Sequence, residues 1–123
     1  IQSSEILTIK QELYELPYVK QLNLDAAKPL VIAQSHGEQI IELPPNALEL
    51  ASSKSSEIEI FAIGNNTLAF QGHPDLNEGW AKQMVSKDGN NNHEHYPISH
   101  QEFSMICYHF IKKEPEGIEN QQQ

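Results

Sequence analysis

Apolar and polar residues alternate along much of the first two thirds of this chain, and the alternation predicts a series of short β-strands. The clearest case is the sequence EIEIFAI at residues 57–63, in which Ile and Ala recur on one side of an extended segment. A period of two is typical of a strand packed against a core. The Gly-Asn-Asn sequence at residues 64–66 tolerates the positive φ values of a tight turn. Residues 67–70 return as a second strand, so we predict a β-hairpin here.

Four upstream segments have a similar strand-like character, and a short helix is expected among them. The predicted strands are residues 1–13, 28–34, 39–43 and 47–53, the first of them buried on both faces at its centre. A polar kink at residues 35–38 separates the second from the third. Leu16, Val19 and Leu22 recur at helical spacing around Pro17, which predicts a short helix that begins at the proline.

Helical periodicity replaces the alternation in the last third of the chain. Residues 77–85 are a predicted helix, and the Asn-rich residues 88–95 are a predicted mobile loop. Ser99, with Glu102 three residues later, has the spacing of a capping box and predicts the start of the last helix. The expected apolar stripe of that helix consists of Phe103, Ile106, Cys107, Phe110 and Ile111.

The order of these elements predicts an α/β fold, with strands followed by two C-terminal helices. We expect residues 1–113 to form part of one domain and residues 114–123 to form a disordered tail, because Pro115 stops the last helix and a polar segment follows. The chain begins at Ile1 without a methionine or a signal-peptide pattern, so we expect that upstream coding sequence is missing from it.

Composition excludes several classes of protein. The 123 residues carry 17 acidic and 8 basic side chains, for a formal net charge of −9. Binding to a phosphate backbone needs clustered Lys and Arg, so we expect no nucleic-acid partner. No apolar run is long enough to span a bilayer, and we expect no membrane insertion. A single cysteine cannot form an internal disulfide, which favours an intracellular, cytoplasmic setting.

The strongest candidate for chemistry is the sequence His73-Pro74-Asp75, which directly follows the predicted hairpin. An imidazole at a strand end, with a carboxylate two residues later, is suited to act as a general base with its orienting partner. The same three residues also suit an ordinary turn, with Asp75 as the N-cap of the helix that follows. The spacing alone leaves both interpretations open.

No cofactor or metal site is expected. His93, His95 and His100, with Glu94 among them, match no zinc template and lie mostly in a polar loop. No Gly-rich loop with a lysine precedes a helix, so the phosphate-cradling signature is absent.

Several segments, taken together and in order, resemble the C-terminal half of class I glutamine amidotransferases. The likeness covers about residues 1–85 and is greatest to the stand-alone group similar to the glutaminase domain of GMP synthase. The matching motifs are Ser35-His36-Gly37-Glu38, Leu43-Pro44-Pro45, Ala51-Ser52-Ser53 and Gln71-Gly72-His73-Pro74-Asp75. The resemblance implies a doubly wound, flavodoxin-like domain, of which this chain is the C-terminal half.

The resemblance also implies site residues. In that family a cysteine on a glycine-rich elbow attacks the side-chain amide of glutamine, and a histidine with a glutamate two residues later completes the triad. The histidine maps onto His73 and the acid onto Asp75, which is one methylene shorter than the usual glutamate. Ser35 and His36 map onto a turn near the active centre and are candidate substrate-binding residues. His36 equally suits a turn histidine satisfied by the backbone.

The nucleophile is the main departure from the family pattern, because this chain has no glycine-rich elbow. Cys107 follows the histidine in sequence and is a predicted core residue of the last helix. The chain alone is therefore not expected to hydrolyse an amide. We expect either an upstream or separate half that supplies the cysteine, with glutamine-like substrates, or a degenerate relative that acts as a scaffold in a complex with another subunit.

Overall fold

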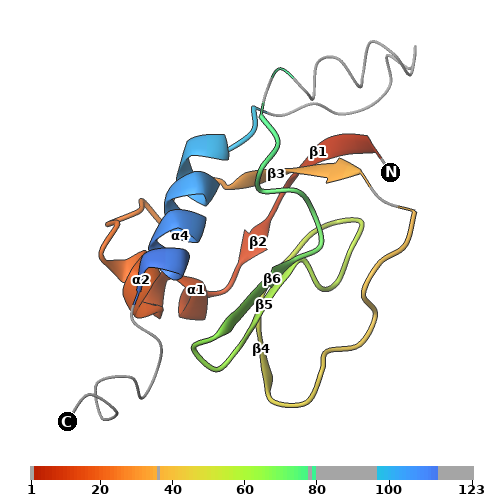
Figure 1. The fold of residues 1–123 in the computed structure, drawn as a ribbon. Helices are drawn as coiled ribbons and strands as arrows, with labels where there is room; N and C mark the ends of the chain where they lie inside the picture. The colour runs from red at the N-terminus through yellow and green to blue at the C-terminus, as the bar shows by residue number, and fades with distance from the viewer. Residues whose placement is uncertain (1, 36, 78, 80–96, 114–123) are drawn as a thin grey trace, which may run out of the picture.

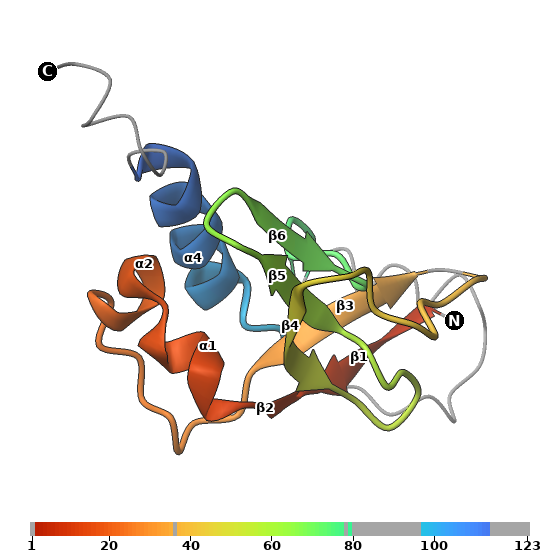
Figure 2. The same cartoon turned by 90° about the horizontal axis from the view of Figure 1, so that it is seen from below.

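The computed structural model describes residues 2–35, 37–77, 79 and 97–113. In chain order its elements are β1 (Gln2–Ile6), β2 (Thr8–Ile9), α1 (Gln11–Glu15), α2 (Pro17–Lys20), β3 (Val31–Ser35), β4 (Ala47–Ser52), β5 (Ile60–Ile63), β6 (Thr67–Phe70) and α4 (His100–Lys112). The labelled helices group on one side of the strands in both views (Figures 1 and 2). The α/β class predicted from the sequence is confirmed.

The described strands form two sheets in which every pairing is antiparallel. One sheet has the order β1-β3 and the other the order β2-β4-β5-β6. The predicted hairpin is present, since Ile63 of β5 pairs with Thr67 of β6, and Gly64 takes a positive φ of 55° in the turn between them. Glycine adopts this conformation without the steric cost that a Cβ would add.

A single hydrophobic core lies between the helices and the strands. Its buried members are Leu7, Leu13, Tyr18, Val19, Leu30, Ile32, Leu50, Ala51, Ile60, Ala62, Phe103 and Ile106. Leu50 and Ala51 are adjacent in β4 yet both fully buried, because the register of β4 against β5 shifts between Glu49 and Ala51. Such a bulge disturbs the strict alternation of strand faces.

The single strand predicted for residues 1–13 is wrong. The chain leaves β2 at Ile9 and begins α1 at Gln11, and the helix carries Leu13 into the core. Nor is the centre of the segment buried on both faces, since Ile6 is 42% exposed. The short helix predicted to begin at Pro17 is confirmed as α2, with the proline in its first turn.

Residues 39–43 were also predicted to be a strand, and they form none. Ile41 is 81% exposed, so the apolar residues of this segment do not mark a strand with a buried face. The backbone N–H of Ile40 donates to the Gln71 side-chain oxygen at 2.7 Å, rather than to a neighbouring strand. The predicted strand at residues 47–53 is confirmed as β4.

The last helix is present, but its predicted capping box is wrong. Ser99 stands at the N-cap of α4 and makes no side-chain cap hydrogen bond. Its hydroxyl instead accepts a hydrogen bond from the Val31 N–H at 2.9 Å, and its own N–H donates to the Val31 oxygen at 2.9 Å. The Glu102 carboxylate accepts from Lys28 at 2.7 Å. The first turn of α4 is therefore bound to the start of β3 and the loop before it.

The apolar stripe of α4 is narrower than predicted. Phe103 and Ile106 are buried, and Phe110 packs edge-on against Tyr18 with ring centroids 5.3 Å apart. Ile111 is 76% exposed. Successive residues of a helix point about 100° apart around its axis. Because the Phe110 side chain points toward the core, the Ile111 side chain points toward solvent.

Most of the predicted helix at residues 77–85, the predicted loop at 88–95 and the predicted tail at 114–123 lie outside the described residues. Within the described part of the chain, no helix has both the length and the apolar character that a membrane crossing requires.

Candidate active site around His73

The chain beyond β6 connects the two sheets and fixes the backbone of His73. The Gln71 N–H donates to the Glu59 oxygen at 2.7 Å, which continues the pairing of the larger sheet. Two residues later the His73 N–H donates to the Ala33 oxygen of β3 at 2.8 Å. In Figure 1 this green segment passes beside β3. His73 is thus held where the segment after β6 meets β3.

Gly72 permits this close approach. A Cβ at this position would lie 2.7 Å from the Ala33 oxygen and 3.1 Å from the Ile32 side chain. A separation under 3.0 Å from a backbone atom requires the backbone itself to move. A glycine at this position is therefore required for the contact between the His73 segment and β3.

The His73 and Asp75 side chains lie near each other at the surface. The Nδ1 atom of His73 is 3.8 Å from the Oδ1 atom of Asp75, and their side chains are 43% and 77% exposed. This separation is longer than a hydrogen bond and suits an ion pair when the imidazole is protonated. The Leu76 N–H donates to the His73 oxygen at 3.3 Å, which closes a turn with Pro74 and Asp75 at its centre. The residues therefore form a turn and also present an accessible imidazole beside a carboxylate.

The turn after β3 is attached to the same region through Gln71. The Gln71 side-chain oxygen accepts from the Ile40 N–H at 2.7 Å, and its nitrogen donates to the Glu38 oxygen at 3.4 Å. Ser35 is the last residue of β3, two positions beyond the Ala33 contact with His73. His36 lies outside the described residues. Sequence reasoning treated Gln71 only as part of a motif and missed this bridging contact.

The buried carboxylate of Glu59 belongs to a residue that is hydrogen-bonded to the His73 segment. Glu59 is 1% exposed, and its Oε2 atom accepts hydrogen bonds from the Gln34 amide at 2.7 Å and from the Ser53 hydroxyl. A buried carboxylate is costly unless such donors satisfy it. The Glu59 backbone oxygen also accepts from Gln71, so this residue connects β3 and β5 to the segment that carries His73. Sequence reasoning missed it, although an acid between Ile58 and Ile60 in a predicted strand is a usable signal.

Cys107 is half-buried on α4, rather than fully buried as predicted. Burial raises the pKa of its thiol, and the negative charge of Asp75 raises this pKa further. The thiolate is the nucleophilic form of cysteine, and both effects oppose its formation. Cys107 accordingly lacks the environment of an activated nucleophile.

The described residues contain no group of three or more His, Cys, Asp or Glu side chains placed to hold a metal ion. His93, Glu94 and His95 lie outside the described residues. His100 faces its own helix, with its Nε2 atom 3.4 Å from the Ser104 hydroxyl.

Comparison with solved structures defines the class of fold. The chain is similar to the crystal structure of SMU.1228c, with a TM-score of 0.57 and 21% sequence identity, over 89% of this chain and 50% of that chain. This likeness shows a shared α/β fold that the chain covers in part, in agreement with a partial flavodoxin-like domain.

Comparison with curated proteins narrows the class. The chain is 30% identical over 99 residues to Gamma-glutamyl peptidase 4 of Arabidopsis thaliana, an alignment that covers 70% of this chain and 39% of the peptidase. It is 36% identical over 65 residues to Gamma-glutamyl peptidase 3 of the same plant, covering 53% of this chain and 26% of that protein. No protein-family model matches the sequence. The chain is thus homologous to γ-glutamyl peptidases, which are of the class I glutamine amidotransferase-like superfamily, and it spans less than half the length of these relatives.

Proposed function

We propose that this chain is the histidine-bearing, C-terminal part of a γ-glutamyl hydrolase of the class I glutamine amidotransferase type, whose nucleophilic cysteine lies outside these 123 residues. The homology to γ-glutamyl peptidases supports the reaction class. The position of His73 supports the proposed site. Its backbone is hydrogen-bonded to Ala33, and its partly exposed imidazole lies beside Asp75. The substrate is a glutamine-like amide or γ-glutamyl amide.

In the proposed reaction, the thiol of the outside cysteine attacks the carbonyl carbon of the amide while His73 accepts the thiol proton. The imidazolium then returns that proton to the departing amine, and a thioester remains. A water molecule, deprotonated by His73, attacks the thioester and releases the γ-carboxylate and the thiol. Asp75 stabilises the imidazolium and fixes its tautomer. For this it approaches from the observed 3.8 Å to a hydrogen-bond distance of about 2.8 Å.

The first test is the upstream reading frame, which should encode a Gly-x-Cys-x-Gly elbow. The second is hydrolysis of a γ-glutamyl peptide by the full-length protein and its variants. We expect His73→Ala to lower kcat/KM by about 10²- to 10⁴-fold, the usual contribution of a positioned general base. His100→Asn is the matched control, because its ring lies against Ser104 on α4, and this variant should retain activity. Unchanged turnover in His73→Ala would refute the mechanism.

A second candidate is a non-catalytic subunit of the same fold that binds another protein. Two observations favour it: Asp75 replaces the longer glutamate of the family pattern, and the Asp75 carboxylate is 3.8 Å from the imidazole and largely exposed. This candidate requires a gene without an elbow cysteine and a stable complex with a partner subunit. Hydrolysis of a γ-glutamyl amide by the purified full-length protein would eliminate it.

A further inference from the structure

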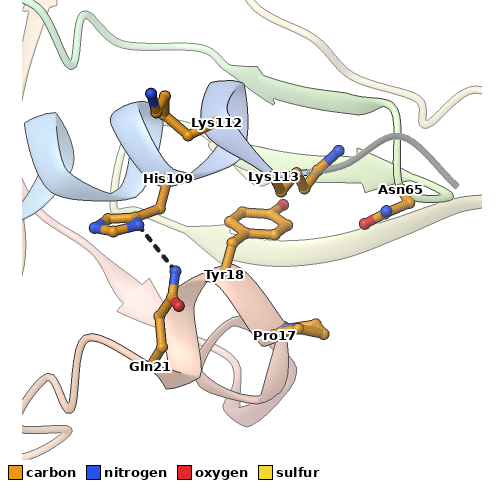
Figure 3. Close-up of a pocket in the computed structure, with 7 residues that line it drawn as sticks. All are labelled: Pro17, Tyr18, Gln21, Asn65, His109, Lys112 and Lys113. Carbon is orange, nitrogen blue, oxygen red and sulfur yellow. Dashed lines mark hydrogen bonds between the residues drawn. The ribbon is translucent and has the colours of Figure 1, made fainter. Parts of the chain in front are cut away.

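A pocket of about 420 Å³ lies between α2, the end of α4 and the turn of the β5–β6 hairpin. Pro17, Tyr18 and Gln21 line it from the α2 side, Asn65 from the hairpin turn, and three basic residues from the last turn of α4 and its C-cap. Figure 3 shows these side chains, with Lys113 beside the Tyr18 ring and the Lys112 ammonium directed away from that ring. Its size is within the range of about 300–1,000 Å³ that is usual for small-molecule sites. None of its lining residues takes part in the site around His73.

The pocket is positively charged in a strongly acidic protein. The chain has a net charge of −9, yet its three basic lining residues are His109, Lys112 and Lys113, and no lining residue is acidic. Neither lysine pairs with a carboxylate among the described residues. By contrast, the Lys28 ammonium is held by Glu102 at 2.7 Å. The two pocket charges therefore remain available to a ligand.

Aromatic rings hold the two ammonium groups without neutralising them. The Lys113 Nζ atom lies 4.5 Å from the centroid of the Phe110 ring and 6.0 Å from that of Tyr18. The Lys112 Nζ atom lies 5.8 Å from the centroid of the Tyr108 ring. Ring faces attract cations at these distances and restrict the lysine side chains. This restriction lowers the entropy cost of ordering them around an anion.

The remaining polar groups can act as donors. The Gln21 side-chain nitrogen lies 2.9 Å from the His109 Nδ1 atom, as the dashed line in Figure 3 shows. When Gln21 donates this bond, the imidazole proton is on Nε2 and is available to a ligand. The Tyr18 hydroxyl keeps its proton at neutral pH, as tyrosine ordinarily does, and burial raises its pKa further to about 12. The Asn65 amide supplies a further donor.

We propose that this pocket binds a small molecule that carries a phosphate group, with an apolar or ring-shaped body against Pro17 and Tyr18. Lysine binds phosphate as a point charge, whereas recognition of a planar carboxylate usually uses the bidentate fork of arginine. All eight basic side chains of this protein other than histidine are lysines. The pocket thus has the donors and charges for a tetrahedral anion together with an apolar wall.

The test is calorimetric titration of the full chain with phenyl phosphate and, separately, with inorganic phosphate. Phenyl phosphate should bind saturably and more tightly than inorganic phosphate, because its ring contacts Tyr18. The double variant Lys112→Gln/Lys113→Gln, which removes both charges and retains part of each aliphatic stem, should weaken binding of both probes by at least about tenfold, or about 1.4 kcal/mol. Lys10→Gln/Lys54→Gln, which removes two charges at positions outside the pocket lining, is the control for total charge and should bind as the wild type does.

A second variant tests the pocket without a change in α4. Asn65→Asp places a negative charge in the pocket lining and should also weaken phenyl phosphate by at least about tenfold. Asn66→Asp adds the same charge at the exposed neighbouring turn position and should leave binding within about twofold. Absence of saturable binding to the wild type, or equal loss in each variant and its control, would overturn the proposal.

Discussion

At the scale of single residues, the position of the candidate general base depends on its backbone contact with β3 and on the residues beside it in the sequence. His73 is placed by a hydrogen bond through its backbone, and this bond forms only because the preceding residue has no side chain. The motif Gln-Gly-His-Pro-Asp therefore encodes a defined backbone geometry. Gln71 binds the turn after β3, Gly72 allows the contact with β3, and Pro74 and Asp75 turn the chain away.

Gly72→Ala should destabilise the protein by about 1–3 kcal/mol, the usual cost of forcing extra atoms into a packed site. The added Cβ would lie 2.7 Å from the Ala33 oxygen, which belongs to the backbone and cannot rotate away. Urea unfolding monitored by circular dichroism measures the change. Gly37→Ala is the matched control, because a Cβ there meets no atom within 4 Å. Equal stability of the two variants would contradict the close contact at Gly72.

Residue-level reasoning from the sequence predicted a site at His73 and Asp75 and a turn at Gly64, but it did not predict the buried role of Glu59. The motif residues are adjacent in sequence, so their pattern is visible locally. Glu59 acquires its partners through the fold, since Gln34 is 25 residues away and comes from the other sheet. An alternating pattern assigns a strand face to Glu59, but only the packed structure reveals that this face is buried as well.

At the scale of elements, the predictions were correct for segments in which the apolar residues of the repeating pattern are the residues that are buried. The hairpin of β5 and β6, the strand β4 and the helix α4 were predicted close to their bounds. The predictions for residues 1–13 and 39–43 were wrong, each for a different reason. In the first, a helix places Leu13 in the core where a continued strand was expected. In the second, apolar residues such as Ile41 are exposed, and a side chain satisfies the backbone of Ile40.

The contact between Lys28 and Glu102 connects α4 to the loop before β3, and it predicts a pH-dependent contribution to stability. The hydrogen bond from Lys28 lowers the pKa of the Glu102 carboxyl below its ordinary value. A group with a lowered folded-state pKa stabilises the fold fully above its unfolded pKa, and this contribution is lost as the pH falls through the folded pKa.

Glu102→Gln should therefore lower the urea midpoint slightly at pH 7, because Lys28 is exposed and solvent screens the charge pair. At a pH below the lowered pKa of Glu102, the variant and the wild type should have the same midpoint. Glu15→Gln, at the exposed end of α1, is the control and should lack this pH-dependent difference. A deficit of Glu102→Gln that persists unchanged in acid would indicate a packing defect instead of a lost charge contact.

At the scale of the whole molecule, the chain has a core of its own and also leaves apolar surface uncovered. Among the described residues, the exposed large apolar side chains are Ile6, Ile41, Leu48, Met105, Tyr108 and Ile111. Met105, Tyr108 and Ile111 follow each other at intervals of three along α4 and share one helical face. In addition, β1 pairs only with β3 among the described strands, so its other edge is open to pairing.

The proposed function explains this surface, because the relatives extend well beyond the part that this chain matches. In a full-length protein of that type, the remaining chain would cover the open edge and the apolar face of α4. The sequence alone predicted a divided domain, and apolar surface left uncovered is a consequence of that prediction. The sequence did not show which apolar residues would be exposed. The residues of the apolar stripe of α4 were all predicted to be core residues, but in the structure some are buried and others are exposed.

The 123-residue chain alone should therefore associate in solution, with copies of the chain covering apolar surface that the remaining protein would otherwise cover. Sedimentation equilibrium over a range of concentrations should give an average mass above that of the monomer. Tyr108→Gln combined with Ile111→Gln should shift the mass toward the monomer without loss of helical signal, since both side chains are exposed and outside the core. Lys54→Gln should associate as the wild type does. A folded wild-type monomer at every concentration would contradict the divided-domain interpretation, because a complete domain has no such surface to cover.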